Sequence, residues 1–365
     1  MSELRLLLVT DAVGGVWTYS LELARALRPL GIEATLAVMG PAATEQQVDD
    51  AGDIRVVDTG LPLEWLASDA GAVHSSGRAI AALAAAEGVD IVQTSSAALL
   101  ADADLRQPSV AVQHSCVASW WAAVKGTPLP QDFEWRRALV ETGLRRADAI
   151  VAPSIAFAAE TSRLYGVHAV PVHNGRGAMW RRDIPQGDFV FTAGRLWDEG
   201  KNVATLDAAA ARVRVPFQAA GSASGPNDTH LELKHVEALG QLSDTRLAGL
   251  FAARPIYASA ALYEPFGLSV LEAAQAGCAL VLSDIPTHRE IWGGAAIFVP
   301  ARDDAAFARA IQDLLHDRDE REQLGQLARS RAAHYTPERM ARGMAAIYAR
   351  LAPQRSEPIQ LAGAA

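Results

Sequence analysis

Short apolar runs alternate with longer amphipathic segments along this chain, and this alternation restricts the fold more than any other feature. It is typical of βα units, in which helices connect the strands of a parallel sheet. In the first part of the chain, strands are predicted at Arg5–Thr10, Glu33–Val38, Ile54–Val57, Asp90–Gln93, Ser109–His114 and Ala149–Ala152. Helices are predicted between them, among others at Thr18–Leu27, Gly77–Ala86 and Glu134–Arg146. This part is therefore predicted to form one doubly wound α/β domain.

A second series of the same kind follows residues 173–187, where Gly, Pro and Asn concentrate as in a linker. Strands are predicted there at Phe189–Ala193, Phe217–Ala220, Ile256–Ala258, Ala279–Leu282 and Ala296–Val299, and helices at Asp304–Leu315, Asp319–His334 and Pro337–Leu351. A chain of 365 residues also exceeds the size at which one hydrophobic core usually stops growing. We expect two Rossmann-like domains, residues 1–172 and 188–336, that face each other across a cleft.

Charge and composition exclude several classes of protein. The 33 Lys and Arg against 42 Asp and Glu give a net charge of −9, which argues against a nucleic-acid-binding protein. No apolar run reaches the roughly 18 to 20 residues of a spanning helix, and no signal peptide is evident, so at most a peripheral membrane contact is expected. Cys116 and Cys278 lie far apart beside apolar residues and are predicted to be buried free thiols, which fits a cytoplasmic protein.

Ligands of open parallel sheets bind beyond the carboxyl ends of the strands, and two features of the first domain lie there. Gly14, Gly15 and Val16 follow the first strand and open a helix, so that backbone N–H groups could meet an anion. A tight turn without a ligand is the alternative. The loop lacks the G-x-G-x-x-G pattern, which disfavours a nicotinamide enzyme. His114 closes the fifth strand and is expected to face the cleft, with a purely structural histidine as the alternative.

In the second domain, Arg195 and Lys201 flank a short loop between the first strand and its helix. Two cations beside a helix N-terminus suit a diphosphate, because Arg offers a fork of donors and Lys a point charge. The alternative is a solvated loop in which both cations pair with Asp198 or Glu199. The sequence leaves these two interpretations open.

The segment from Tyr263 to Gly277 is the most specific. Pro265 and Gly267 are expected to hold Glu264 in a turn, and Leu268–Ala276 is predicted to be a helix that carries Glu272. The two carboxylates would then line one pocket, with the helix N-terminus between them. Carboxylates accept hydrogen bonds from vicinal hydroxyls, such as those of a sugar or a ribose.

Taken together, these segments resemble glycosyltransferase family 4, whose members are retaining enzymes of the GT-B fold. The resemblance implies that Glu272 holds the donor ribose, that Glu264 and His114 contact the transferred sugar, and that Arg195 and Lys201 bind the diphosphate. It also implies that the last helix, near residues 337–352, packs back on the first domain. The other implied donor-binding residues are Gly14, Gly15, Val16, Asn174, Gly221, Leu242, Phe266, Gly267 and Leu268.

The predicted activity is transfer of a sugar from a nucleotide sugar, UDP- or GDP-linked, to a glycan, lipid-linked or small-molecule acceptor. No Asp-x-Asp metal site is evident, and the cationic loop could neutralise the leaving diphosphate, so neither a metal nor another cofactor is expected. The acceptor is expected near Trp17, His114 and Trp120–Trp121. A GT-B phosphorylase and a non-catalytic two-domain sugar-binding protein are the alternatives.

Overall fold

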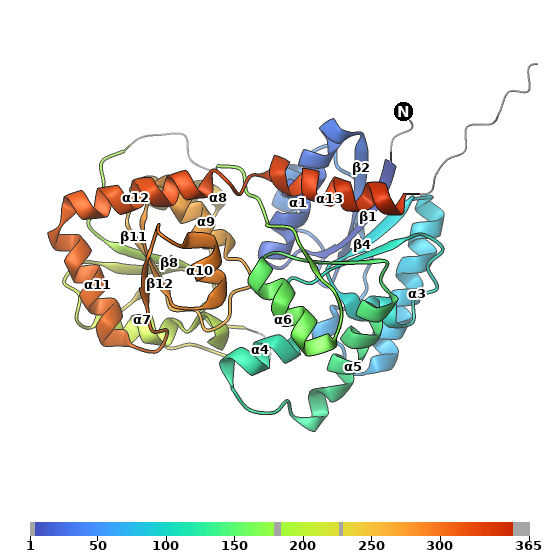
Figure 1. Cartoon of the computed structure of the whole chain (residues 1–365), viewed down its shortest axis with the longest axis horizontal. Coiled ribbons are helices and arrows are strands. Elements are labelled where there is room, and N and C mark those ends of the chain that lie inside the picture. The colour runs from blue at the N-terminus through green and yellow to red at the C-terminus, as the bar shows by residue number, and fades with distance from the viewer. Residues whose placement is uncertain (1–3, 179–183, 226–228, 353–365) are drawn as a thin grey trace, which may run out of the picture.

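The computed structural model describes residues 4–178, 184–225 and 229–352, and within them the chain forms two parallel sheets (Figure 1). The first sheet has the strand order β3-β2-β1-β4-β5-β6-β7. Its strands are β1 (Leu4–Asp11), β2 (Ile32–Met39), β3 (Val56–Asp58), β4 (Ile91–Thr94), β5 (Ser109–Val112), β6 (Ala149–Ala152) and β7 (Val170–Pro171). The second sheet has the order β10-β9-β8-β11-β12-β13. Its strands are β8 (Val190–Ala193), β9 (Phe217–Ala220), β10 (Glu237–Ala238), β11 (Ile256–Ser259), β12 (Ala279–Ser283) and β13 (Ile297–Val299).

Helices connect these strands in both halves. The first half contains α1 (Gly15–Leu27), α2 (Glu45–Ala51), α3 (Ala70–Glu87), α4 (Val117–Val124), α5 (Gln131–Arg146), α6 (Ile155–Tyr165) and the 3-10 turns η1 (Arg28–Leu30), η2 (Glu64–Leu66) and η3 (Ala97–Ala101). The second half contains η4 (Glu199–Lys201), α7 (Val203–Ala210), α8 (Asp244–Ala252), α9 (Leu268–Ala276), α10 (Pro286–Trp292), α11 (Asp304–His316), α12 (Arg318–Ala332) and finally α13 (Pro337–Leu351). The prediction of a two-sheet α/β architecture is confirmed.

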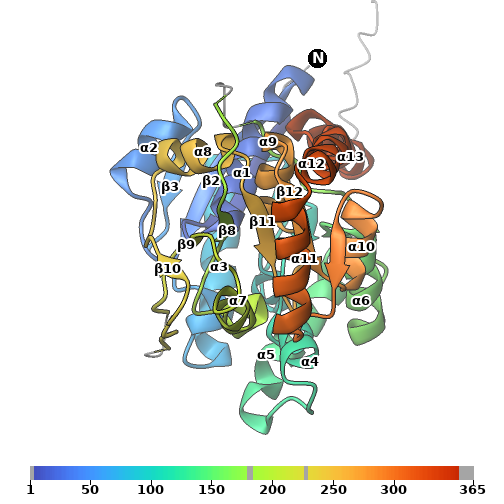
Figure 2. The same ribbon diagram turned by 90° about the vertical axis from the view of Figure 1, so that its left-hand side faces the viewer.

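Both sheets are buried on both faces, as the continuous apolar runs of their strands predict. Successive side chains of a strand point to opposite faces. In β1, Leu7 therefore belongs to one core cluster and Leu6 and Leu8 to the other. The second sheet repeats this arrangement, with α7 and α11 on one face and α8, α9 and α12 on the other. Figure 2 shows α7 and α11 on the near side of that sheet.

The described strands differ from the predicted ones at several of their ends and by two additional short strands. β5 ends at Val112, so His114 lies two residues beyond the strand rather than at its last position. The two-residue strands β7 and β10 were not predicted, because a pair this short has no sequence periodicity and exists only through its neighbour in the sheet. Residues 179–183 of the predicted linker lie outside the described residues.

Helix α13 lies against the first sheet's helices although it follows the whole second sheet in the chain (Figure 1). Its buried residues Met340, Met344 and Tyr348 belong to the same core cluster as Leu23 of α1. The crossing requires a glycine at 175, because a Cβ there would lie 2.2 Å from the backbone of Thr336. Helix α13 therefore belongs to the core of the first domain, although it follows the second domain in the sequence.

Candidate active site between the two domains

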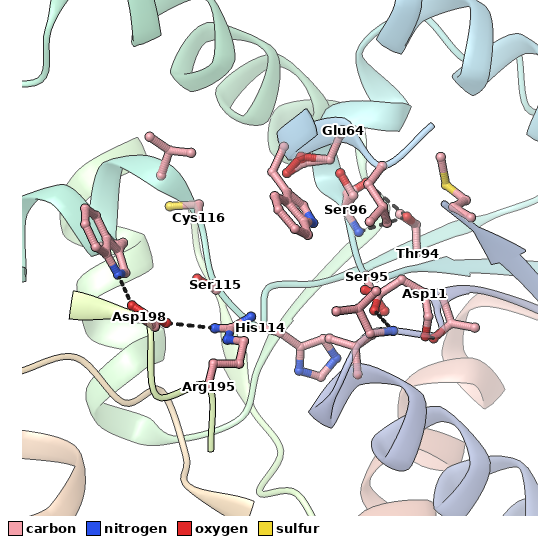
Figure 3. Close-up of a pocket in the computed structure, with 18 of the residues that line it drawn as sticks. Asp11, Glu64, Thr94, Ser95, Ser96, His114, Ser115, Cys116, Arg195 and Asp198 are labelled. Atoms are coloured by element: carbon pink, nitrogen blue, oxygen red, sulfur yellow. Dashed lines mark hydrogen bonds and ion pairs between the residues drawn. The ribbon is translucent and has the colours of Figure 1, made fainter. Parts of the chain in front are cut away.

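A cavity of about 390 Å³ opens between the carboxyl ends of the first sheet's strands and the loop that follows β8. Asp11 at the end of β1, Ser95 after β4 and His114 after β5 line it from the first domain, and Arg195 and Asp198 line it from the second. Figure 3 shows these side chains around the hollow, with the Arg195–Asp198 pair joined by a dashed line. The site is therefore where the topology of parallel sheets places ligands.

His114 lies in this cavity as a neutral ring. Burial lowers the pKa of its imidazole to about 4. The ring packs edge-on against Tyr19 with centroids 4.4 Å apart, and its buried Nε2 makes no hydrogen bond to any described residue. A neutral imidazole can both donate and accept a hydrogen bond, but it cannot supply positive charge. A contact with a substrate hydroxyl fits this state.

The loop after β8 is held by its own acidic residues. Arg195 Nη2 lies 3.1 Å from the Oδ2 atom of Asp198, whose Oδ1 accepts hydrogen bonds from Trp120 Nε1 at 2.9 Å and from the backbone N–H of Gly200. The pairing of Arg195 with Asp198 is one that the sequence left open. Nearly half of the Arg195 side chain stays exposed, so it retains donors for a ligand.

Lys201 forms an ion pair with Glu264 rather than with Asp198 or Glu199. Glu199 instead pairs with Lys125 of the first domain. Lys201 ends η4, and Glu264 lies on the loop before α9. The ion pair therefore links a residue predicted to bind the diphosphate with one predicted to contact the sugar. Gly221 packs directly against this loop. Only glycine fits there, since a Cβ at its φ of 132° would lie 1.7 Å from the carbonyl oxygen of Gly194.

Glu272 is buried and pairs with a different cation, Arg176 of the interdomain linker, at 3.0 Å. Arg176 also lies 3.0 Å from Glu22 of α1, so one guanidinium bridges the two domains. Burial raises the pKa of Glu272. That Glu264 and Glu272 line one donor pocket stays a prediction. Each carboxylate is engaged by its own cation, because a buried charge without a partner is costly.

The glycine loop of the first domain meets the start of α9 across the cleft. A Cβ on Gly15 would lie 3.4 Å from Leu268 Cδ1, and Gly14 has a φ of 80°. Gly267 precedes the helix with a φ of 92°, which favours glycine and leaves the first N–H groups of α9 outside any side-chain cap. Phe266 is buried beneath this turn, and Val16 lines the cavity.

Two further residues predicted to bind the donor lie near the hinge and at the edge of the second domain. Asn174 is buried in the linker, and its Oδ1 makes no hydrogen bond to a described residue. Leu242 packs partly buried against the core cluster that contains Phe266. Their contacts with a nucleotide stay predictions.

The tryptophans of the predicted acceptor region lie in two different places. Trp120 and Trp121 line the cavity, whereas Trp17 is 6% exposed and packs in the core between α1 and α13. The placement of Trp17 in the acceptor region was therefore wrong. Helix α1 turns this side chain toward the sheet, as its apolar neighbours Leu21 and Ala24 on the same face require.

Three charged residues of the site were not predicted. Asp11 ends β1 and could have been found by its position at a strand's carboxyl end. Glu64 lies on η2 and Arg176 in the linker, and neither has a local pattern that distinguishes it from a solvated charge. Burial raises the pKa of Asp11 to about 6 and that of Glu64 to about 7.

Solved structures of similar architecture define the class of this fold. Sucrose-phosphate synthase from Thermosynechococcus elongatus matches with a TM-score of 0.79 at 20% identity, over 96% of this chain and 99% of that one. HepE from Anabaena, in complex with UDP-glucose, matches with a TM-score of 0.74 at 19% identity, over 96% of this chain and 100% of that one. A glycosyltransferase from Rickettsia africae matches with a TM-score of 0.71 at 18% identity, over 96% and 99%. The architecture is the GT-B fold.

Family models match both halves of the sequence. Residues 13–176 match Glycosyltransferase Family 4, and residues 188–331 match Glycosyl transferases group 1. The chain belongs to the glycosyltransferases of family 4 type, as its sequence motifs predicted. None of the curated proteins compared with it matched the sequence.

Two searches of the described residues bear on the remaining expectations. None of the helices in residues 4–178, 184–225 and 229–352 has the length and apolar character needed to cross a membrane. Within the same ranges, no three His, Cys, Asp or Glu side chains come together in a way that could hold a metal ion.

Proposed function

We propose that the chain is a retaining, metal-independent glycosyltransferase that uses a UDP- or GDP-linked sugar as donor. One observation carries the proposal: the loop after β8 holds two cations, Arg195, which lines the cavity, and Lys201, which pairs with Glu264 on the turn before α9. Two cations there can neutralise a leaving diphosphate without a metal ion. The UDP-glucose named for HepE, which has the same fold, makes a UDP-sugar the first donor to test. The two buried free thiols, Cys116 and Cys278, fit a cytoplasmic location.

In the proposed reaction, the bond between the anomeric carbon and the phosphate oxygen breaks, and its electron pair stays on the diphosphate. The acceptor hydroxyl attacks the same face of the sugar, and its proton passes to the departing phosphate oxygen. Arg195 and Lys201 stabilise the charge on that oxygen, while Glu264 and neutral His114 hold the sugar hydroxyls. Glu272 holds the ribose once the nucleotide takes over from Arg176.

The experiment that tests this proposal follows release of nucleoside diphosphate from UDP- and GDP-sugars, with and without added acceptors. The product's anomeric configuration is read by NMR, and the assay is repeated in the presence of a chelator. Inversion at the anomeric carbon or loss of activity with the chelator would contradict the mechanism. Turnover that requires inorganic phosphate instead of a nucleotide would identify a phosphorylase, and calorimetric sugar binding without any turnover would identify a binding protein.

A further inference from the structure

The cavity between the domains extends well past the residues proposed to hold the donor. Besides His114 and Arg195, it is lined by Met39, Leu63 and Leu99 of the first domain. Its volume of about 390 Å³ lies at the small end of the range for small-molecule sites, about 300–1,000 Å³. We call the part that Met39, Leu63 and Leu99 line the inner part of the cavity; it shares this volume with the part next to His114 and Arg195.

Aromatic rings form part of this inner wall. Trp65, Trp121 and Phe133 line the cavity, and the rings of Trp121 and Phe133 lie 5.8 Å apart. The indole N–H of Trp121 donates to Thr127 and that of Trp120 to Asp198, so the polar edges of both are already satisfied. What these two rings leave for a ligand is apolar surface, on which another ring can stack.

The charges of the cavity disfavour an anionic ligand in its inner part. Among the described residues that line it, Arg195 is the one cation, and it lies at the end where the diphosphate is proposed to bind. Asp198 and Glu199 are occupied by Arg195 and Lys125. A phosphate or carboxylate on the acceptor would therefore meet carboxyl groups in the lining, while Arg136, behind Glu64 and Phe133, donates to the carbonyl oxygen of Ala67.

Two carboxyl groups remain to recognise hydroxyls. Asp11 accepts one hydrogen bond, from the backbone N–H of Val13 at 2.7 Å, and forms no ion pair within the described residues. The Glu64 side chain forms neither an ion pair nor a hydrogen bond with any described residue, and burial raises its pKa to about 7. Such groups are normally hydrogen bonded when they are removed from water.

We propose that this inner part of the cavity is the acceptor site and that it takes a neutral, hydroxylated small molecule with an apolar ring face, which stacks on Trp65 and Trp121 and donates hydroxyls to Glu64 and Asp11. The inference rests on the proposed transferase function, since it supplies that reaction's acceptor. It excludes a phosphorylated acceptor or a lipid diphosphate whose charged group enters the cavity.

Calorimetry without a donor tests the proposal with three probes: para-nitrophenyl glucoside, methyl glucoside and para-nitrophenyl glucuronide. The first is neutral and aromatic, the second lacks the apolar ring, and the third carries a carboxylate. We expect the neutral aromatic glucoside to bind at least about tenfold more tightly than either of the others. Trp65→Ala should remove its advantage over methyl glucoside, and Glu64→Gln should reduce its advantage over the glucuronide.

Matched variants control for general damage. Leu66→Ala changes an exposed side chain on the same turn as Glu64 and Trp65, and Glu33→Gln changes an exposed carboxylate at the opposite end of β2 from Met39. Both should bind the probes as the parent does. Circular dichroism verifies that each variant is folded, and the comparison of three probes on the parent protein needs no variant.

Equal or tighter binding of the glucuronide would overturn the inference, and so would failure of the neutral glucoside to bind at millimolar concentration. Donor hydrolysis with no glucoside binding would overturn the acceptor assignment alone. Glucoside binding with no turnover of any nucleotide sugar would contradict the proposed function and leave a binding site of the predicted chemistry.

Discussion

On the second domain's side of the cleft, the charged side chains of the proposed donor site are ion paired within the protein, whereas the two carboxyl groups of the first domain's cavity have no ion-pair partner among the described residues. Lys201 pairs with Glu264, Arg195 with Asp198 and Glu272 with Arg176. Asp11 and Glu64, across the cleft, have raised pKa values because burial disfavours their charged forms. The first wall fits the charged donor that we propose, and the second fits the proposed neutral acceptor.

The comparison also shows what each wall must do when a substrate binds. On the donor side, a charged ligand has to replace or join an existing ion pair, so affinity depends on the difference between two sets of charge contacts. On the proposed acceptor side, a ligand fills apolar space, and its hydroxyl groups donate hydrogen bonds to the carboxyl groups of Glu64 and Asp11. Substitutions on the two sides should therefore fail in different assays.

The largest effect is expected for Arg195→Ala. The guanidinium is proposed to bind the diphosphate, whose charge grows as the sugar leaves, and loss of one such donor typically lowers turnover by about a hundredfold to a thousandfold. Steady-state transfer kinetics measure it. Arg212→Ala is a matched control, because Arg212 pairs with Asp304 on the surface of the same domain and should change turnover little. Near-parental turnover of Arg195→Ala would place the leaving group elsewhere.

Arg176→Met tests the paired character of the donor side through stability. The substitution leaves Glu22 and Glu272 without their shared cation, and removal of one partner from a buried ion pair costs about 3–5 kcal/mol. Because Arg176 keeps about 12% exposure, we expect a loss nearer 2–3 kcal/mol in the free energy of unfolding.

Denaturant unfolding measures this loss, and Arg289→Met serves as the control, since the Arg289–Asp284 pair is exposed and should contribute less than about 1 kcal/mol. A loss as small as that of the control would show that Arg176 does not support the two glutamates. In that case, adding nucleoside diphosphate should also leave the difference in the free energy of unfolding between the parent and Arg176→Met unchanged.

Glu272→Ala and Glu264→Ala divide the donor side into its nucleotide and sugar parts. Glu272→Ala removes the proposed ribose contact, which donor and product share, and a hydrogen bond to a charged group is worth about 1.5–3 kcal/mol. Affinity for the nucleoside diphosphate should therefore fall by about tenfold to over a hundredfold. Glu264→Ala should leave that affinity almost unchanged and depress transfer. Calorimetry beside a transfer assay separates them, and equal losses of nucleotide affinity would refute the division.

The smallest expected effect is on the pH dependence of stability, to which the unpaired carboxyl group of Glu64 contributes. The pKa of Glu64 is raised from its ordinary value of 4.5 to about 7, chiefly by burial, with Arg136 lowering it and Asp11 raising it. The folded protein then binds more protons than the unfolded chain between these values, so its stability falls as pH rises through this window. Glu64→Gln should remove that component, about 1–3 kcal/mol.

Unfolding free energies of the parent and Glu64→Gln at pH 5 and pH 8 measure this component as the change in their difference. The variant should gain relative to the parent at the higher pH. Glu33→Gln, whose carboxylate is exposed, should follow the parent at both values. A difference that stays constant with pH would mean that Glu64 ionises normally, and the contrast between the two walls would weaken.

Most of the fold follows from local sequence. The predicted helices Leu268–Ala276 and Pro337–Leu351 coincide with α9 and α13, because glycines bound the first, while a Thr cap, Pro337 and an apolar stripe define the second. The central strands follow for a similar reason, since a strand buried on both faces appears as a continuous apolar run. The edge strand β10 could not be predicted, because it depends on its neighbour β9 in the sheet.

The sequence by itself also determined which residue types gather at the cleft, through the glycine loop, the cationic loop and the paired glutamates, since each follows a strand whose carboxyl end must face it. Only the tertiary structure decided how those charges are satisfied. Arg176 meets Glu272 across 96 positions of sequence, and Lys201 meets Glu264 across 63. Pairing of buried charges depends on distance in space and on exclusion of water, and neither is encoded in local sequence patterns.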